Sequence, residues 1–244
     1  MSDSAKVAIV AALEGEVRAL VKCWRVTERE YEGRRFRFFE SADTVLVCGG
    51  IGSEAARRAT EAVIALYHPA LVRSVGFAGA LDPALKVGEI FSPSSVIDAR
   101  DGSSVETGTG SGVLVSADAV AGAEQKAKLK EAYGAHAVDM EAASVARGAQ
   151  ARGVRFMAVK AISDESDFVM PSLDRFVDRG EFRTGRFLIF AAMRPWLWAD
   201  VIQLGRNSAK ASRALCAELD RYLDVPKKAE VSGPDLHPIS KVVS

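Results

Sequence analysis

The chain has few of the residues that build disulfide frameworks or metal centres. Its 244 residues include three histidines and three cysteines, and Cys23, Cys48 and Cys216 are scattered without a CxxC pair or a histidine at ligand spacing. This odd set argues against both a disulfide framework and a zinc site, and it fits a reducing cytosol. No other cluster of side chains implies a metal or an organic cofactor, so we expect the protein to use none.

Net charge and long apolar runs are also lacking. The 32 basic and 32 acidic side chains give a formal net charge of zero at pH 7, without a basic block interleaved with aromatic residues, so nucleic acid is not an expected partner. Residues 1–13 have no charged segment before a long apolar core, which argues against a signal peptide. Arg194 and Asp200 break the longest apolar runs near the C-terminus, so no membrane span is expected. These absences indicate a cytoplasmic protein.

What the chain does contain is apolar residues, 48% of the total, which is ample for a sizeable core. Apolar runs of strand length alternate with helical segments, and this alternation predicts one α/β domain over residues 1–224. The polar, proline-bearing residues 225–244 are expected to be a disordered tail. Expected elements include strands Tyr31–Glu40, Thr44–Cys48 and Leu71–Leu81, a surface loop Arg100–Gly112, and helices Ser53–Tyr67, Glu124–Tyr133 (with a solvated face), Thr184–Met193 and Trp196–Leu223.

Two carboxylates end two predicted strands within Ala137–Asp164. Ala142–Arg152 has helical composition after Glu141, and Arg155–Ile162 is an apolar run that stops just before Asp164. We interpret this stretch as a β-α-β unit with an acid at the carboxyl end of each strand, where open α/β sheets place their ligand crevices. The alternative is that Glu141 only starts one helix and Asp164 caps the next, which is the commoner meaning of such spacing taken alone.

A second motif, Gly50–Ala55, formally matches the GxGxxA pattern of dinucleotide sites. It follows the wrong strand, because the first strand-to-helix turn holds Glu14–Gly15–Glu16 instead of a glycine-rich loop. The strand Leu71–Gly76 also offers no acid at its end for a ribose diol. We therefore expect the glycines to let the backbone turn tightly into a helix, or to let a small polar ligand approach the backbone.

Four blocks follow one another along residues 7–167: VAIVAALEGEV, VLVCGGIGSEAARRA, VGFAGALDPALKVGEI, and VDMEAASVA with VKAISDESD. They resemble the nucleoside phosphorylase/nucleosidase superfamily, in particular its methylthioadenosine/S-adenosylhomocysteine nucleosidase branch. The resemblance implies a three-layer single domain with a mixed central β-sheet flanked by helices. It also implies cleavage of the N-glycosidic bond of a purine nucleoside, through an oxocarbenium-like transition state.

Three acids match the catalytic positions of that family. Asp164 matches the general acid that donates toward N7 of the base, and burial at an apolar strand end would be needed to keep it protonated. Glu141 matches the acid that holds the ribose hydroxyls and faces the developing positive charge. Glu16 matches the acid that orients the attacking water, whereas Glu14 is expected to be a surface acid. The resemblance places further residues at the substrate: Met140 beneath the sugar, and Phe77, Gly79, Gly52, Val120 and Ser163.

The residues that would bind phosphate in a phosphorylase of this superfamily are missing. The charge of Glu16 in the first turn would repel phosphate. Ser74 stands where those enzymes have arginine, and Phe77 where they have serine, while Arg73 is one position off and is expected to point away. Water is therefore the expected nucleophile, and a phosphate-dependent phosphorylase is the alternative.

Some positions also depart from the nucleosidase pattern. Phe77 replaces a serine near the ribose, and Val120 sits where an aromatic ring usually stacks on the base, which argues against efficient cleavage of methylthioadenosine itself. The blocks SVGFAGALDPAL and RPWLWADVIQLGRNSAKASRAL resemble the hopanoid-associated phosphorylase-like proteins, which are assigned to removing adenine from adenosylhopane, a lipid nucleoside.

That second resemblance implies contact with lipid near the C-terminus. The residues expected to touch a lipid tail or the membrane surface are Phe187, Leu188, Phe190, Trp196, Leu197 and Trp198. The alternative is that they pack on the sheet or at a dimer interface. The family also implies a homodimer or larger homo-oligomer. A non-catalytic nucleoside-binding protein on the same fold is a further alternative, against which the three retained acids argue.

Overall fold

The computed structural model describes residues 7–168, 177–178, 181–182 and 198–224. A mixed sheet of eleven strands forms the centre of this part of the chain, in the order β2-β3-β4-β1-β5-β10-β9-β7-β8, with β11 pairing β5 and β6. The strands are β1 (Val7–Ala11), β2 (Arg25–Tyr31), β3 (Arg34–Ser41), β4 (Thr44–Cys48), β5 (Leu71–Ala80), β6 (Ile90–Phe91), β7 (Ser95–Asp98), β8 (Ser104–Glu106), β9 (Val113–Ser116), β10 (Ala137–Asp139) and β11 (Arg155–Asp164). A separate pair is β12 (Val177–Asp178) and β13 (Glu181–Phe182).

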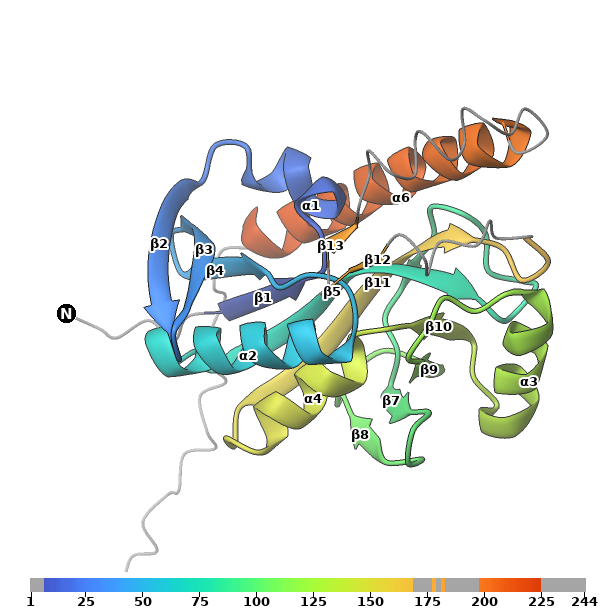
Figure 1. Ribbon diagram of the computed structural model, residues 1–244, viewed down its shortest axis with the longest axis horizontal. Helices are drawn as coiled ribbons and strands as arrows, with labels where there is room; N and C mark the ends of the chain where they lie inside the picture. Colours follow the sequence, from blue (N-terminus) through green and yellow to red (C-terminus); the bar gives the residue numbers. More distant parts are fainter. Residues whose placement is uncertain (1–6, 169–176, 179–180, 183–197, 225–244) are drawn as a thin grey trace, which may run out of the picture.

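Helices cover both faces of the sheet, which confirms the three-layer α/β expectation (Figure 1). Two helices lie together on one face, two on the other, and α3 lies at the end of the sheet near β9 and β10 (Figure 1). The first pair is α1 (Glu14–Val21) and α6 (Trp198–Asp224), the second is α2 (Ser53–Tyr67) and α4 (Ala142–Gln150), and the fifth helix is α3 (Ala123–Tyr133). No helix in the described ranges is long and apolar enough to cross a membrane.

Small residues let α2 and α4 lie close to one another and to the sheet. Ala56, Ala59 and Ala62 of α2 are almost fully buried, as are the alanines of α4. A Cβ atom added at Gly148 of α4 would lie 2.8 Å from Cγ2 of Thr60 of α2. The Thr60 side chain therefore packs directly against the backbone of α4. This close packing matters for function because it fixes the N-terminal ends of both helices at the same edge of the sheet.

The central interpretation of the sequence needs one correction. β10 and β11 are not neighbouring parallel strands of a β-α-β unit: both pair with β5, β10 in antiparallel and β11 in parallel orientation. β10 pairs only with the last two residues of β5, Gly79 and Ala80, because β5 extends beyond the end of β1. Glu141, which follows β10, and Asp164, which ends β11, therefore lie on opposite sides of β5. Both nevertheless line the same cavity, which is described below.

Other expected elements were right in kind but not always in extent. Helix Ser53–Tyr67 and strand Thr44–Cys48 have the expected bounds. The strand expected over Tyr31–Glu40 is β3, but it begins at Arg34 because a turn at Glu32–Gly33 joins it to the polar edge strand β2, which was not expected. The loop expected over Arg100–Gly112 contains the short strand β8. The expected helix Thr184–Met193, the tail 225–244 and the residues Phe187 to Leu197 lie outside the described part, and nothing is described of the Trp198 side chain.

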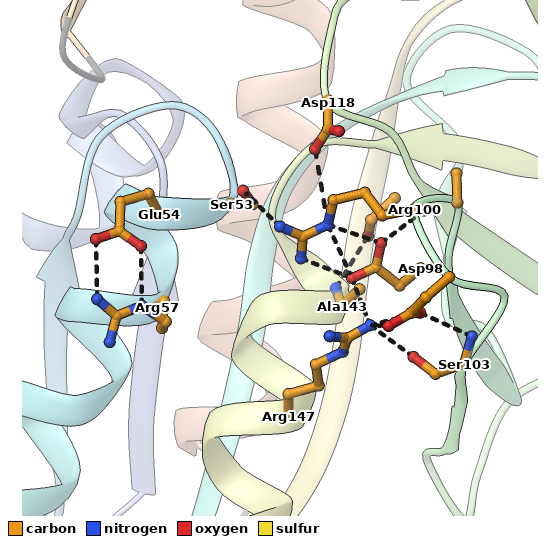
Figure 2. A network of polar contacts seen from close by, with 12 residues as sticks. Ser53, Glu54, Arg57, Asp98, Arg100, Ser103, Asp118, Ala143 and Arg147 are labelled. Atoms are coloured by element: carbon orange, nitrogen blue, oxygen red, sulfur yellow. Dashed lines mark hydrogen bonds and ion pairs between the residues drawn. The ribbon is translucent and has the colours of Figure 1, made fainter.

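A polar network joins the end of β7 and the turn after it to helices α2 and α4 (Figure 2). Asp98 is 2% exposed and lies 2.7 Å from Arg100 Nη2 and 2.9 Å from Arg147 Nη2. Arg147, on α4, also pairs with Asp101, and Arg100 lies 3.4 Å from the hydroxyl of Ser53 at the start of α2. Because the buried carboxylate and both guanidinium groups are paired, we assign this network a structural role in holding the loops beside the cavity described next.

Candidate active site

A cavity of about 320 Å³ opens where β5, β10 and β11 end. Eight of the nine residues selected from the sequence line it: Glu16, Phe77, Gly79, Val120, Met140, Glu141, Ser163 and Asp164. The cavity also has Ala119 and Ala121 at its wall, together with Leu204 and Ser208 of α6. Segments far apart in the sequence thus meet at one place, and all three selected acids are among them.

Glu16 reaches the cavity from the first turn of α1. The helix begins at Glu14, so the stretch expected as a turn is helical, as acids near a helix N-terminus favour. Glu16 is 7% exposed, and its Oε2 accepts a hydrogen bond of 3.3 Å from the Leu13 amide. Burial raises its pKa above the ordinary value, although the Leu13 amide and the charge of Lys160 oppose the rise. Glu14 is exposed and pairs with Arg37, which confirms it as a surface acid.

Glu141 precedes the first turn of α4 and faces the glycine-rich turn before α2. The amide of Gly52 donates a hydrogen bond of 2.7 Å to its Oε1, and Gly52 is not among the residues that line the cavity. Gly52 has a φ of 93°, which glycine adopts readily. The amide of this glycine-rich turn therefore binds the Glu141 carboxylate, and not the phosphates of a dinucleotide. Burial, helped by the charge of Asp139, raises the pKa of Glu141 to about 7.

Sequence reasoning missed Lys160, a fully buried lysine among these acids. It lies in β11 opposite Gly76 of β5 and is 1% exposed. Its Nζ lies 2.8 Å from Asp139 Oδ2 and 3.1 Å from the Ser74 hydroxyl. Burial acts to lower its pKa, but the charges of Asp139 and Glu141 together raise it above the ordinary value. The signal was present in the sequence, because a charged residue within an apolar strand requires a buried partner.

Asp164 forms the other charged end of the cavity. It is 3% exposed, its Oδ1 accepts a hydrogen bond of 2.6 Å from the Ser163 hydroxyl, and its Oδ2 lies 2.5 Å from Nζ of Lys126. Asp164 is buried at the end of an apolar strand, as expected, but a lysine supplied by α3 pairs with it, which was not expected. The solvated face expected for this helix is wrong at Lys126, which is 2% exposed.

The two ends of the cavity are spaced along β5. A Cβ atom added at Gly76 would lie 3.0 Å from Glu16 Oε2, and one added at Gly79 would lie 2.8 Å from Asp164 Oδ2. These glycines are three positions apart, or about 10 Å along β5. This spacing suits a ligand that has one reacting group near Glu16 and a ring near Asp164.

Substituting Gly79 by alanine tests how closely the end of the cavity at Asp164 is packed. The added methyl group would meet Asp164 Oδ2 at 2.8 Å and Lys126 Cε at 3.2 Å, so it must displace the ion pair. We expect kcat/KM to fall by about a hundredfold, since small displacements of catalytic groups have effects of this order. Gly205→Ala is the matched control, because nothing lies within 4 Å of its added Cβ. Equal kinetics of both variants would contradict this geometry.

The raised pKa of Glu141 also predicts a pH-dependent stability. Between the ordinary value of 4.5 and about 7, the folded protein binds the Glu141 proton more tightly than the unfolded chain does. The free energy of unfolding therefore falls as pH rises through this window. Glu141→Gln lacks this contribution, so from about pH 5 to pH 8 the wild type should lose about 2–3 kcal/mol more than the variant. Urea unfolding at both pH values measures it, and parallel losses would contradict the assignment.

Comparison with known proteins agrees with this arrangement. The sequence profile of the family described as "Phosphorylase superfamily" matches residues 6–121 and 107–181. The chain belongs to this superfamily. A 5′-methylthioadenosine/S-adenosylhomocysteine nucleosidase of Glaesserella parasuis is 28% identical over 203 residues, covering 66% of this chain and 86% of the relative. A second such nucleosidase, from Staphylococcus haemolyticus, is 28% identical over 196 residues, covering 65% of this chain and 86% of the relative.

Solved structures of the superfamily share the fold. The methylthioadenosine/S-adenosylhomocysteine nucleosidase of Neisseria meningitidis, in complex with methylthio-immucillin-A, superimposes with a TM-score of 0.67 at 19% identity, covering 89% of this chain and 98% of that one. The futalosine hydrolase of Helicobacter pylori gives a TM-score of 0.65 at 20% identity, with the same coverage. In the described part of this superfamily member, no group of three or more histidine, cysteine or acidic side chains is arranged to hold a metal ion.

Proposed function

We propose that the protein is a purine nucleosidase, a hydrolase that cleaves the N-glycosidic bond of an adenine nucleoside. The observation that carries the proposal is the pair of buried carboxylates at the two ends of one cavity, with Glu141 on its wall. Glu16 can accept a proton from water, and a base with a raised pKa does this well near neutral pH. Glu141 can hold the ribose hydroxyls and face the ribosyl cation. The nucleosidase relatives support the same reaction class.

The charges around the cavity favour water over phosphate as the nucleophile. Four carboxylates line the cavity, those of Glu16, Asp139, Glu141 and Asp164, and no arginine does so among the described residues. Arg73, the arginine of β5, instead has its guanidinium over the Tyr222 ring of α6, at 4.5 Å from the ring centre. The cationic lysines are already paired with carboxylates. A phosphate ion would therefore meet net negative charge.

Base release from purine nucleosides tests the proposal. We expect adenine to be released from adenosine or a 5′-substituted adenosine in phosphate-free buffer. A requirement for phosphate would favour the phosphorylase alternative. Tight nucleoside binding without any base release would favour a non-catalytic binding protein. Chromatography of the released base distinguishes these outcomes.

A wider groove beside the cavity supports a bulky apolar 5′ substituent, such as the lipid of adenosylhopane. This groove has a volume of about 1010 Å³, and Leu13, Glu16, Phe77 and Ser208 line both it and the cavity. Its apolar wall consists of Leu13, Ala19, Val21, Trp24, Val26, Phe39 and Phe77. A substituent that leaves the ribose near Phe77 would therefore enter a groove of lipid-sized volume with an apolar wall and charged residues along the rest of its lining.

A substrate series and one groove variant test the lipid-nucleosidase hypothesis. We expect kcat/KM to rise with the apolar size of the 5′ group in the wild type. Trp24→Glu should remove this preference, by about tenfold or more for the largest substituent, and leave adenosine cleavage unchanged. Ile202→Glu is the control, since Ile202 is 53% exposed and does not line the groove. A wild-type rate independent of substituent size would contradict the hypothesis.

The proposed cellular setting follows from this substrate. We place the enzyme in the cytoplasm, with peripheral contact to a membrane through the C-terminal aromatics for delivery of a lipid-linked nucleoside. A homodimer or larger homo-oligomer stays a prediction, and size-exclusion chromatography coupled to light scattering measures it. Flotation with liposomes measures the membrane contact.

A further inference from the structure

One buried cation at the base end of the cavity is not explained by the reaction as proposed so far. α3 carries Lys126, Lys128 and Lys130, of which Lys128 and Lys130 are solvent-accessible and pair with surface acids. Lys126 instead lies on the buried side of the helix with Leu129 and lines the cavity. A lysine is buried at a cost of several kcal/mol unless it is well paired. Its position at a ligand cavity therefore indicates a role beyond helix packing.

Both carboxyl oxygens of Asp164 accept hydrogen bonds, so Lys126 supplies the N–H donors at this end of the cavity. Ser163 donates to one carboxyl oxygen of Asp164 and Lys126 donates to the other, so the carboxylate accepts at both oxygens. A second N–H of Lys126 donates to the backbone oxygen of Glu165 at 2.6 Å. An ammonium has three donors, which leaves one beyond these two described acceptors for a ligand in the cavity. Gly79, without a side chain, makes room for the pair against β5.

We propose that Lys126, and not the Asp164 carboxyl to which the resemblance assigns this role, is the catalytic residue that protonates the departing base, with Asp164 as its counter-ion. This inference rests on the proposed nucleosidase function and deepens it. A ring nitrogen of the purine accepts a hydrogen bond from the Lys126 ammonium in the ground state. This interaction strengthens as the base gains negative charge, which is the condition for catalysis.

The proton balance of the step is complete. The bond between C1′ and the base nitrogen breaks, and its electron pair moves into the purine ring. The ring nitrogen takes a proton from the Lys126 ammonium, which becomes a neutral amine. Water forms the new bond to C1′ and gives its proton to Glu16. After the products leave, Glu16 returns this proton through solvent and Lys126 is protonated again.

Lys126→Arg separates proton transfer from charge. Arginine keeps the ion pair with Asp164, but it does not give up its proton in proteins. We expect kcat for adenosine to fall by about a hundredfold or more, which is the usual contribution of a positioned acid. Cleavage of 4-nitrophenyl riboside should stay within about threefold of the wild type, because nitrophenolate leaves without protonation. Lys128→Arg, two residues further along the same helix and exposed, is the control.

The same pair of substrates decides the outcome. A Lys126→Arg variant that cleaves adenosine as fast as the wild type would overturn the proposal, and equal losses on both substrates would assign Lys126 a structural role. Lys126→Met, measured in the same way, replaces the arginine variant if that variant does not fold. No base release by the wild type would contradict the proposed function itself, whereas equal activity of wild type and variant contradicts only the role of Lys126.

Discussion

Replacing Glu16 by glutamine is expected to lower kcat for nucleoside hydrolysis by about a thousandfold. Glutamine keeps the size of the side chain and can still accept the hydrogen bond from the Leu13 amide. It cannot take the proton that water loses as it attacks C1′. Because the pKa of Glu16 is raised by burial, the wild-type rate should also fall as pH drops and the carboxylate becomes protonated.

Adenine release over a range of pH measures both parts of this prediction. Glu14→Gln is the matched control, since Glu14 lies two residues earlier in the same helix, is exposed and pairs with Arg37. The control should keep the rate and the pH profile of the wild type. A Glu16→Gln variant with an unchanged rate would show that another group activates the nucleophile.

Replacing Lys160 by methionine is expected to destabilise the fold by about 3–5 kcal/mol. Methionine fills a similar volume but leaves Asp139 and Glu141 buried without their cation. Asp139 keeps the hydrogen bonds from the Ser116 hydroxyl and the Ala142 amide, so the loss is mainly electrostatic. The pKa of Glu141 should rise further, because Lys160 is among the groups that lower it.

Urea unfolding near neutral pH measures the loss in stability. Lys128→Met is the control, because its side chain is 71% exposed and pairs with Glu124 at the surface, where ion pairs contribute little. The control should change the free energy of unfolding by less than about 1 kcal/mol. A similarly small change in Lys160→Met would mean that the buried carboxylates are held in their neutral form.

The sequence was sufficient to predict elements with strong local patterns. Ser53–Tyr67 was predicted to its ends because an apolar stripe is bounded by a glycine turn and a left-handed residue, His68. The polar edge strand β2 was missed because few of its side chains are buried, so no alternation of apolar residues marks it. The relative direction of β10 and β11 was wrong because pairing depends on β5, which lies more than fifty residues earlier.

The acids of the site could be selected from the sequence, whereas their cations could not. Glu141 and Asp164 end elements at one sheet edge, a position that local pattern and resemblance both mark. Lys126 is buried by a partner 38 residues away, and its helix otherwise has the composition of a solvated surface element. Lys160 is recognisable in the sequence as a charged residue within an apolar strand. Its partner Asp139 could not be predicted, because it comes from β10, on the other side of β5. Charge pairing across the sheet is set by topology, which the sequence alone does not display.

The identity of the sugar product tests the central claim most directly. The wild-type enzyme is incubated with an adenosine substrate in oxygen-18-labelled water, with and without phosphate, and the products are analysed by mass spectrometry. Hydrolysis predicts free adenine and a ribose that carries one labelled oxygen at C1, at the same rate in both buffers. Turnover only with phosphate, with ribose 1-phosphate as the product, would contradict the account of Glu16 and its cavity.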